Sequence, residues 1–301
     1  MRKTDTVRRL SYRYQRTVAG SAEVRGVGFL TGANVRLRFL PAAPGSGVVF
    51  VRTDLRPRAY VPAHVALVTG TTRRTTLGRQ PAQIGLVEHV LAALAGLRID
   101  NCLVELNAPE PPGLDGSARA YVDALLTAGT RPQPARRAVY AVEETVVVSA
   151  AGATLALHPA DGAGLTVSYF LDYGLQSPIG RQVHTEVVTP ASFANELSMC
   201  RTFILDSEAE ELRRQGLGSR TTPGDLLVFG PHGPIDNRLR YANEPARHKI
   251  LDVIGDLSLL GVDLCGHVTA YRSGHPLNVT LARLLYERLH SSCGCGQPLA
   301  A

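Results

Sequence analysis

The strongest constraint on the fold is an order of predicted elements that the chain runs through twice. In the first half, several extended segments are followed by an apolar helical segment at 87–96, a strand at 101–107 and a helix that begins near Ser117. In the second half, extended segments are again followed by a helix at 244–261, a strand, a loop and a closing helix. This repeated order predicts an α+β protein of two similar domains, each a sheet covered by helices.

The domain boundary is predicted from a polar segment between the two halves. TRPQPARR at 130–137 contains two prolines and follows a predicted helix end, so we expect it to be a linker. The first domain then covers residues 1–130 and the second covers residues 138–301. A site built from both halves would lie in the cleft between them, where ligand sites are common. The polar, Gly- and Pro-marked segment 71–83 is predicted to be a surface excursion.

Composition and charge exclude several classes of protein. With 45% hydrophobic and 19% charged residues, the 301-residue chain is typical of a globular protein. It has no apolar run near the ~20 residues of a membrane span and no apolar segment typical of a secretory signal. Five cysteines, few and odd in number, favour the reducing cytoplasm. The net charge of +6 is compatible with anionic partners. The arginines of the chain form no dense run, however, so we expect no nucleic acid among its partners.

A candidate metal site follows from the spacing of two residues on the second predicted helix. His248 and Asp252 are four residues apart, so both side chains project from one face and can converge on a divalent ion. The same spacing is also explained without a metal, by a helix whose exposed polar face carries one ion pair between His248 and Asp252. His89 is the best third ligand, and Glu88 beside it could take a proton from a metal-activated water.

Two further segments carry candidate catalytic residues. His275 follows a predicted strand end, and a histidine there can act as a general acid near neutral pH, with Asp256 as its partner. Thr202 could donate to a developing oxyanion. Taken alone, the first segment favours a histidine in a surface loop, and the second favours the end of a core strand.

Taken in order, these segments resemble the UDP-3-O-acyl-N-acetylglucosamine deacetylases, the LpxC family of zinc enzymes in lipid A synthesis. The resemblance runs from residue 15 to residue 278 and includes VEHVLAALAGLRIDN, NAPEPPGLDGSA, NEPARHKILDVIGDL and AYRSGH. It implies a fold of two similar α+β domains with the active site in the cleft between them, each domain carrying a small insert. The second insert, expected within 204–238, would form an apolar passage for the acyl chain.

The resemblance also implies a metal site and the residues that act around it. The zinc ligands would be His89, His248 and Asp252, with one zinc per chain, and the same ligand set suits Fe2+. Glu88 would be the general base for the attacking water, and Thr202 would stabilise the oxyanion. His275, oriented by Asp256, would protonate or stabilise the leaving amine.

The implied reaction is hydrolysis of the N-acetyl group of UDP-3-O-acyl-N-acetylglucosamine, with release of acetate. Lys249 and Phe203 would line the substrate site, and Arg272 stands where the family usually has lysine, near the anionic nucleotide. Two positions depart from the family pattern. Leu30 replaces a histidine that faces the site, and Leu86 replaces a threonine, so both departures bear on rate and substrate fit.

Two other functions stay open on the sequence. A related zinc amidohydrolase acting on another nucleotide sugar would need the same ligands but no acyl passage. A basic, non-catalytic RNA-binding protein is the second, although a structural zinc site would need a fourth protein ligand that the sequence does not offer. We therefore expect the acylated UDP-sugar and water as partners, a monomer, no nucleic acid, no integral membrane association and no second enzyme domain.

Overall fold

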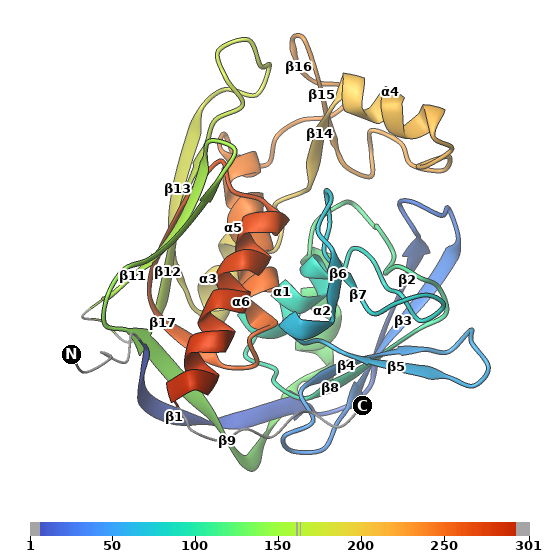
Figure 1. Cartoon of the computed structure of the whole chain (residues 1–301). Coiled ribbons are helices and arrows are strands. Elements are labelled where there is room, and N and C mark those ends of the chain that lie inside the picture. Colours follow the sequence, from blue (N-terminus) through green and yellow to red (C-terminus); the bar gives the residue numbers. More distant parts are fainter. Residues whose placement is uncertain (1–6, 161, 163, 293–301) are drawn as a thin grey trace.

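The structure is a computed structural model that describes residues 7–160, 162 and 164–292. It is an α+β fold, as the repeated order of elements predicted, with two large sheets and helices packed between them (Figure 1). No helix in this part of the chain combines the length and apolar composition needed to cross a membrane.

The first large sheet is built from the first half of the chain. Its five strands have the order β2-β3-β8-β4-β5. In that order the strands are Ala22–Val27, Asn34–Pro41, Cys102–Leu106, Val48–Arg52 and Ala59–Pro62. Apolar side chains alternate with polar ones along β3, where Val35, Leu37 and Phe39 are buried. One face of this sheet therefore packs against the core.

The second large sheet has seven strands. Its main path is β1-β9-β17-β11-β10, and β12 pairs with β17 while β13 pairs with β12. The strands in chain order are β1 (Val7–Val18), β9 (Thr130–Val142), β10 (Val146–Ala150), β11 (Ala153–His158), β12 (Leu165–Leu171), β13 (Gln182–Val188) and β17 (Asp263–Tyr271). All of them except β1 come from residue 130 onward.

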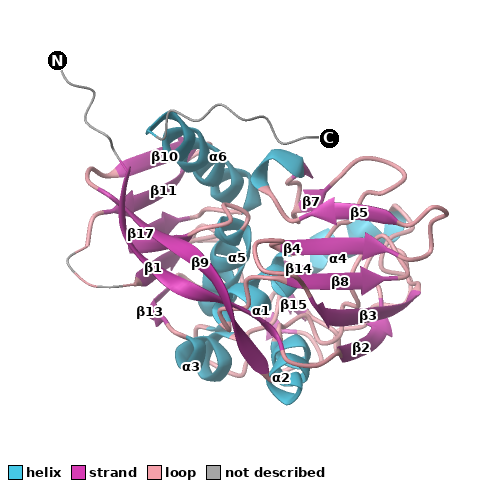
Figure 2. Cartoon of the chain, turned by 90° about the horizontal axis from the view of Figure 1, so that it is seen from below, coloured by secondary structure: helices cyan, strands magenta, loops and turns pink. Residues whose placement is uncertain are grey.

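The prediction of a linker at 130–137 is wrong, because these residues are part of β9. This strand pairs antiparallel with β1, for example Arg13 opposite Arg137, and Figure 2 shows the two as one long twisted ribbon. In the described structure β9 pairs with β17 only at 139–141, so its proline-containing start has β1 as its single strand neighbour. Prolines are tolerated where a strand has a free edge, and this is why a proline-rich, polar segment can be a strand here.

The two helices predicted at 87–96 and 244–261 are confirmed as α1 (Glu88–Gly96) and α5 (Glu244–Ser258). They lie side by side between the two sheets (Figures 1 and 2). The remaining helical elements are η1 (Val65–Leu67), α2 (Arg119–Ala128), α3 (Pro190–Ser192), the π-helical segment Phe193–Leu197, α4 (Asp206–Arg214) and α6 (His275–Ser292). Buried apolar residues from both halves of the chain form one continuous cluster around α1 and α5.

Smaller elements complete the fold around the ends of α1 and α5. β6 (Val68–Gly70) and β7 (Thr76–Leu77) form a short hairpin. A three-stranded sheet of β14 (Phe203–Leu205), β15 (Leu227–Gly230) and β16 (Gly233–Pro234) lies with α4 at the upper right of Figure 1. This layer has its own small apolar cluster, to which Ala209, Leu226 and Val228 belong.

Candidate active site and metal centre

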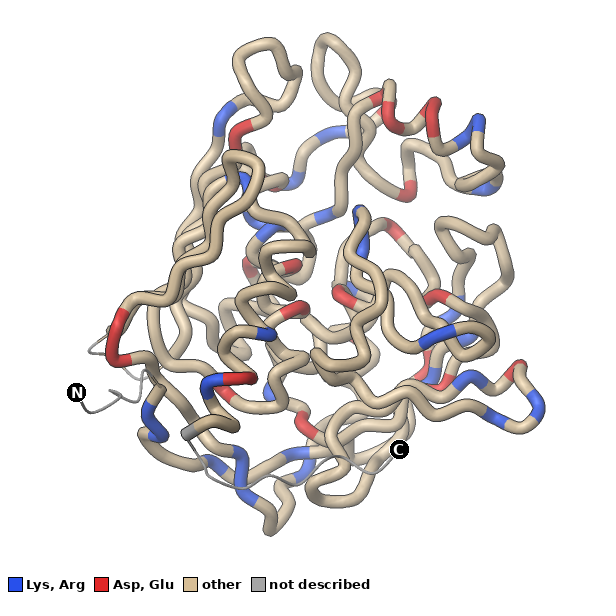
Figure 3. The backbone as a smooth tube through the Cα atoms, in the orientation of Figure 1, with Lys and Arg blue, Asp and Glu red and all other residues tan. Residues whose placement is uncertain are grey.

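Three side chains from α1 and α5 converge where the two helices meet. The possible ligand atoms of His89, His248 and Asp252 all lie within 4.8 Å of one another. Asp252 Oδ1 lies 3.6 Å from His89 Nε2 and 3.4 Å from His248 Nε2. Figure 3 shows acidic residues in this central region, whereas many basic residues lie toward the periphery, including β1 and β9.

The environment of Asp252 shows that these residues fit a metal ion. Its Oδ2 accepts a hydrogen bond from Lys249 Nζ at 2.9 Å. Its Oδ1 is buried and has no hydrogen-bond partner among the described residues, which is a costly state for a carboxylate oxygen. A cation between this oxygen and the two imidazoles would satisfy it. Two imidazole nitrogens and one carboxylate oxygen are a ligand set typical of catalytic zinc.

The protonation states of the three residues also suit a metal site. His248 Nδ1 lies 3.0 Å from the Cys200 carbonyl oxygen, to which it can donate, and this leaves Nε2 toward the site. Burial lowers the pKa of His248 to about 3, although Asp252 acts in the opposite direction. Burial would raise the pKa of Asp252, but Lys249 and His248 outweigh it and hold that pKa well below its ordinary value. The candidate metal site therefore contains the neutral imidazole of His248 and the ionised carboxylate of Asp252, with His89 beside them.

Glu88 is the first residue of α1, next to His89, and its carboxylate is buried beside the candidate metal ligands. Its Oε2 accepts a hydrogen bond from the backbone N–H of Thr75 at 3.0 Å. Its Oε1 lies 4.0 Å from His275 Nε2. Burial raises the pKa of the Glu88 carboxyl group, which His275 and His89 oppose only in part. A carboxylate with a raised pKa accepts a proton more readily, as a general base must.

His275 is the first residue of α6 and lies on the other side of the same space. Its Nδ1 is 2.8 Å from Asp256 Oδ2, which also accepts from Asn278 Nδ2 at 2.9 Å. Its Nε2 is 3.9 Å from Asp252 Oδ2. Burial lowers the pKa of His275, but Asp256 and Glu88 outweigh it and raise the pKa to about 9. The imidazole is therefore protonated at neutral pH and can donate from Nε2.

The prediction that segment 71–83 is a surface excursion is wrong at three of its residues, since Leu77 is buried together with the two threonines before it. Thr75 and Thr76 are buried, and Thr75 is fully enclosed. The Thr75 hydroxyl donates to Asp256 Oδ1 at 2.5 Å and lies 3.4 Å from His275 Nδ1. The local sequence, a run of Thr and Arg residues, does not indicate that Thr75 is buried. Thr75 is buried because it donates hydrogen bonds to the carboxylates of Glu88 and Asp256, which are distant in the sequence.

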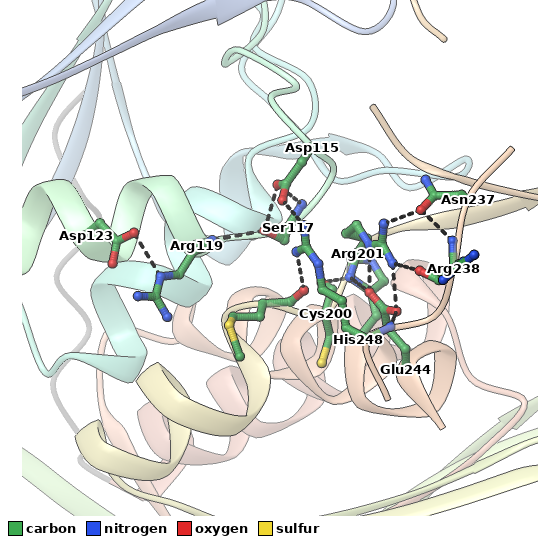
Figure 4. Close-up of polar contacts among 12 residues, drawn as sticks. Asp115, Ser117, Arg119, Asp123, Cys200, Arg201, Asn237, Arg238, Glu244 and His248 are labelled. Atoms are coloured by element: carbon green, nitrogen blue, oxygen red, sulfur yellow. Dashed lines mark hydrogen bonds and ion pairs between the residues drawn. The ribbon is translucent and has the colours of Figure 1, made fainter. Parts of the chain in front are cut away.

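A buried ion pair, also missed on the sequence, holds the Cys200–Phe203 segment against α5 (Figure 4). Arg201 Nε donates to Glu244 Oε1 at 2.8 Å, and the Arg201 backbone N–H donates to the same oxygen at 3.0 Å. Both side chains are almost completely buried. Glu244 is in the first turn of α5, and His248 follows one turn later. The pair therefore fixes the carbonyl of Cys200 beside the His248 ring.

The remaining predicted residues line one cavity of about 690 Å³ that opens beside the His/Asp cluster. Lys249 Nζ lies 5.7 Å from the centre of the Phe203 ring, and that ring packs edge-on against His248. Arg272 pairs with Asp172 at 2.9 Å. The cavity wall includes Thr202, Leu30 and Leu86, and its apolar lining includes Phe29, Ile204, Leu212, Leu217, Leu226 and Val228.

Comparison with known proteins shows the family to which the chain belongs. The family model described as "LpxC: UDP-3-O-acyl N-acetylglycosamine deacetylase" matches residues 15–287. A UDP-3-O-acyl-N-acetylglucosamine deacetylase of Nostoc sp. is 39% identical over 274 residues, covering 89% of this chain and 97% of the relative. The protein of the same name from Myxococcus xanthus is 38% identical over 275 residues, covering 89% and 85%. That from Teredinibacter turnerae is 38% identical over 276 residues, covering 91% and 90%. The chain therefore belongs to the LpxC family of UDP-3-O-acyl N-acetylglycosamine deacetylases.

Proposed function

We propose that this protein hydrolyses the N-acetyl group of UDP-3-O-acyl-N-acetylglucosamine and releases acetate, a step in lipid A biosynthesis. The observation that carries the proposal is the convergence of His89, His248 and Asp252 between Glu88 and His275. Membership of the LpxC family supports the same substrate. An amide is a poor electrophile and an amine a poor leaving group, so the reaction needs both a base and an acid at one place.

His89, His248 and Asp252 would hold one zinc ion per chain, and their donor set would also accept Fe2+. When bound, such an ion makes a water more acidic and polarises the amide carbonyl. The unpartnered Oδ1 of Asp252 and the orientation of His248 Nε2 toward the site support this assignment.

Glu88 and His275 divide the proton transfers. Glu88 takes a proton from the attacking water, since its Oε2 is held by Thr75 and its Oε1 is turned toward the space that His275 Nε2 also faces. His275 then donates its Nε2 proton to the leaving nitrogen. Asp256 keeps the imidazole in the orientation for this transfer by accepting from Nδ1.

The cavity beside these residues matches a substrate that is anionic at one end and apolar at the other. Thr202 would stabilise the oxyanion, and Lys249 and Phe203 would hold the sugar next to the reacting amide. Arg272 at the cavity wall would contact the nucleotide. The apolar lining that residues 204–228 contribute supports an insert within 204–238 that encloses the acyl chain.

The proposed division is a first domain at residues 1–130 and a second at residues 138–301. The residues between them begin β9 and therefore go with the second domain, whose sheet β1 also joins. The protein would act as a monomer in the cytoplasm, with the acylated UDP-sugar and water as its partners. The free, buried Cys102, Cys200 and Cys265 support a reducing compartment.

Metal analysis combined with an acetate-release assay tests the function. The wild type should bind about one zinc per chain and release acetate from the acylated UDP-sugar. Glu88→Ala should keep the metal and lose the activity, whereas His248→Ala should lose both. Equal turnover of the sugar without its acyl chain would favour a different amidohydrolase. Salt-dependent RNA binding without any acetate release would contradict the enzyme assignment.

A further inference from the structure

We propose that Thr75 is a positioning residue that sets the general acid and the general base of this site at the same time. Its hydroxyl holds the carboxylate that orients His275, and its backbone N–H holds the carboxylate of Glu88. This inference rests on the proposed function, because it assigns Thr75 to the reaction in which those two residues act.

The hydroxyl of Thr75 completes the binding of the Asp256 carboxylate. Oδ2 of Asp256 is held by His275 Nδ1 at 2.8 Å and Asn278 Nδ2 at 2.9 Å. Oδ1 accepts from the Thr75 hydroxyl at 2.5 Å, and among the described side chains this hydroxyl is the one donor to Oδ1. A carboxylate held at one oxygen can rotate about its Cβ–Cγ bond, whereas one held at both oxygens cannot. Thr75 therefore fixes the plane in which Asp256 meets the His275 ring.

The geometry also assigns the direction of the hydrogen bonds. An ionised carboxylate only accepts, so the Thr75 hydroxyl proton points to Asp256 Oδ1. The oxygen of that hydroxyl lies 3.4 Å from His275 Nδ1, farther than the 2.8 Å from Nδ1 to Asp256 Oδ2. The Nδ1 proton is therefore directed to Asp256, and Nε2 is the nitrogen that faces the reacting amide.

The backbone of Thr75 is tied to the start of α1 in both directions. Its N–H donates to Glu88 Oε2 at 3.0 Å, and its carbonyl accepts from the Val87 N–H at 3.4 Å. Thr75 is completely buried, so neither bond competes with water. A side-chain substitution removes the hold on Asp256 and retains the N–H that binds Glu88, which makes the two contributions separable.

The test compares Thr75→Val, which has the shape of threonine without the hydroxyl, with Thr75→Ser, which keeps the hydroxyl. Thr76→Val is the matched control, because Thr76 is the buried neighbour in the same hairpin and lies outside the hydrogen bonds described here. We expect kcat to fall about 10- to 100-fold in Thr75→Val with KM nearly unchanged. Thr75→Ser should restore most of the rate, and Thr76→Val should behave like the wild type.

A second readout does not depend on turnover. The His275 Nδ1–H bound to Asp256 should give a downfield proton resonance, assigned by its loss in His275→Gln. This resonance should persist in Thr75→Ser and shift or broaden in Thr75→Val. Should Thr75→Val fail to fold, Thr75→Ala replaces it with the same expectations.

A hydroxyl-free variant with wild-type kcat and an unchanged resonance would overturn the role of Thr75. So would a loss of rate that Thr75→Ser does not restore, since that loss would follow from packing and not from the hydroxyl. If the wild type releases no acetate from the acylated UDP-sugar, the proposed function fails instead. The resonance comparison then still decides whether Thr75 orients His275 through Asp256.

Discussion

The backbone carbonyl oxygen of Glu88 lies 2.2 Å from the point where a Cβ on Gly255 would stand. Helices α1 and α5 therefore touch backbone to backbone at this position, which only glycine permits. One helix carries His89 and the other carries His248 and Asp252. The spacing of the proposed metal ligands consequently depends on the absence of a side chain at Gly255.

We expect Gly255→Ala to separate α1 from α5. Alanine normally favours a helix over glycine, but here its methyl group meets the Glu88 backbone, so the free energy of unfolding should fall by roughly 1–3 kcal/mol. Zinc affinity should fall as well. Urea unfolding and metal titration measure both quantities. Gly180→Ala, where a Cβ meets nothing within 4 Å, is the control. A Gly255→Ala protein with wild-type stability and affinity would contradict the close approach.

Metal removal should destabilise the protein. An ion that binds the folded chain but not the unfolded one raises the unfolding temperature, and here it would also satisfy the buried Oδ1 of Asp252. We expect the wild type to unfold at a lower temperature after treatment with a chelator. Asp252→Ala should show little further change, because its site no longer holds the ion. Calorimetry with and without zinc checks this, and an identical shift in Asp252→Ala would place the metal elsewhere.

In the metal-free protein, stability should fall as the pH rises toward 9. The folded protein holds the pKa of His275 at about 9, above the unfolded value near 6.5. A raised folded pKa contributes stability below pH 6.5, and this contribution is lost between that pH and about 9, with a maximum on the order of 3 kcal/mol. Urea unfolding of wild type and His275→Gln across this range isolates the effect. Parallel curves for the two proteins would contradict the raised pKa.

The buried Arg201–Glu244 pair should be sensitive to the removal of one partner. Arg201→Met leaves Glu244 charged and enclosed, so we expect a loss of about 3–5 kcal/mol in the free energy of unfolding. Arg119→Met is the control in the same region (Figure 4), because the Arg119–Asp123 pair is about half exposed and should contribute less than about 1 kcal/mol. Equal losses in the two variants would show that burial does not decide the effect.

Local patterns predicted much of the fold and brought together the side chains of the proposed metal site. The spacing of His248 and Asp252 placed both residues on one face of a helix, and both lie on α5 next to His89. The apolar helical segment expected at 87–96 matches α1 closely. These features depend on residues a few positions apart, whose geometry follows from helix periodicity alone.

The features that were missed depend on residues far apart in the chain. The Thr75 hydroxyl meets a carboxylate 181 residues away, so no pattern around Thr75 marks it. Arg201 meets Glu244 across 43 residues, and in a chain rich in arginine its type is not informative. The prolines of 130–137 suggested a linker because the local sequence does not show which strand pairs with this segment. The partner is β1, at the other end of the first half of the chain.

The pairing of β1 with β9 has a consequence for how the chain is made. During synthesis, β1 leaves the ribosome long before residue 142 does. Until then its described partners in the first half are the bridge to Asn101 and the backbone bonds beside it, so most of its edge is unpaired. Unpaired strand edges are templates for aggregation. A chaperone would therefore be needed while only the first half of the chain has been synthesised. A truncated chain that stops at residue 130 should therefore precipitate rather than accumulate as a stable fragment.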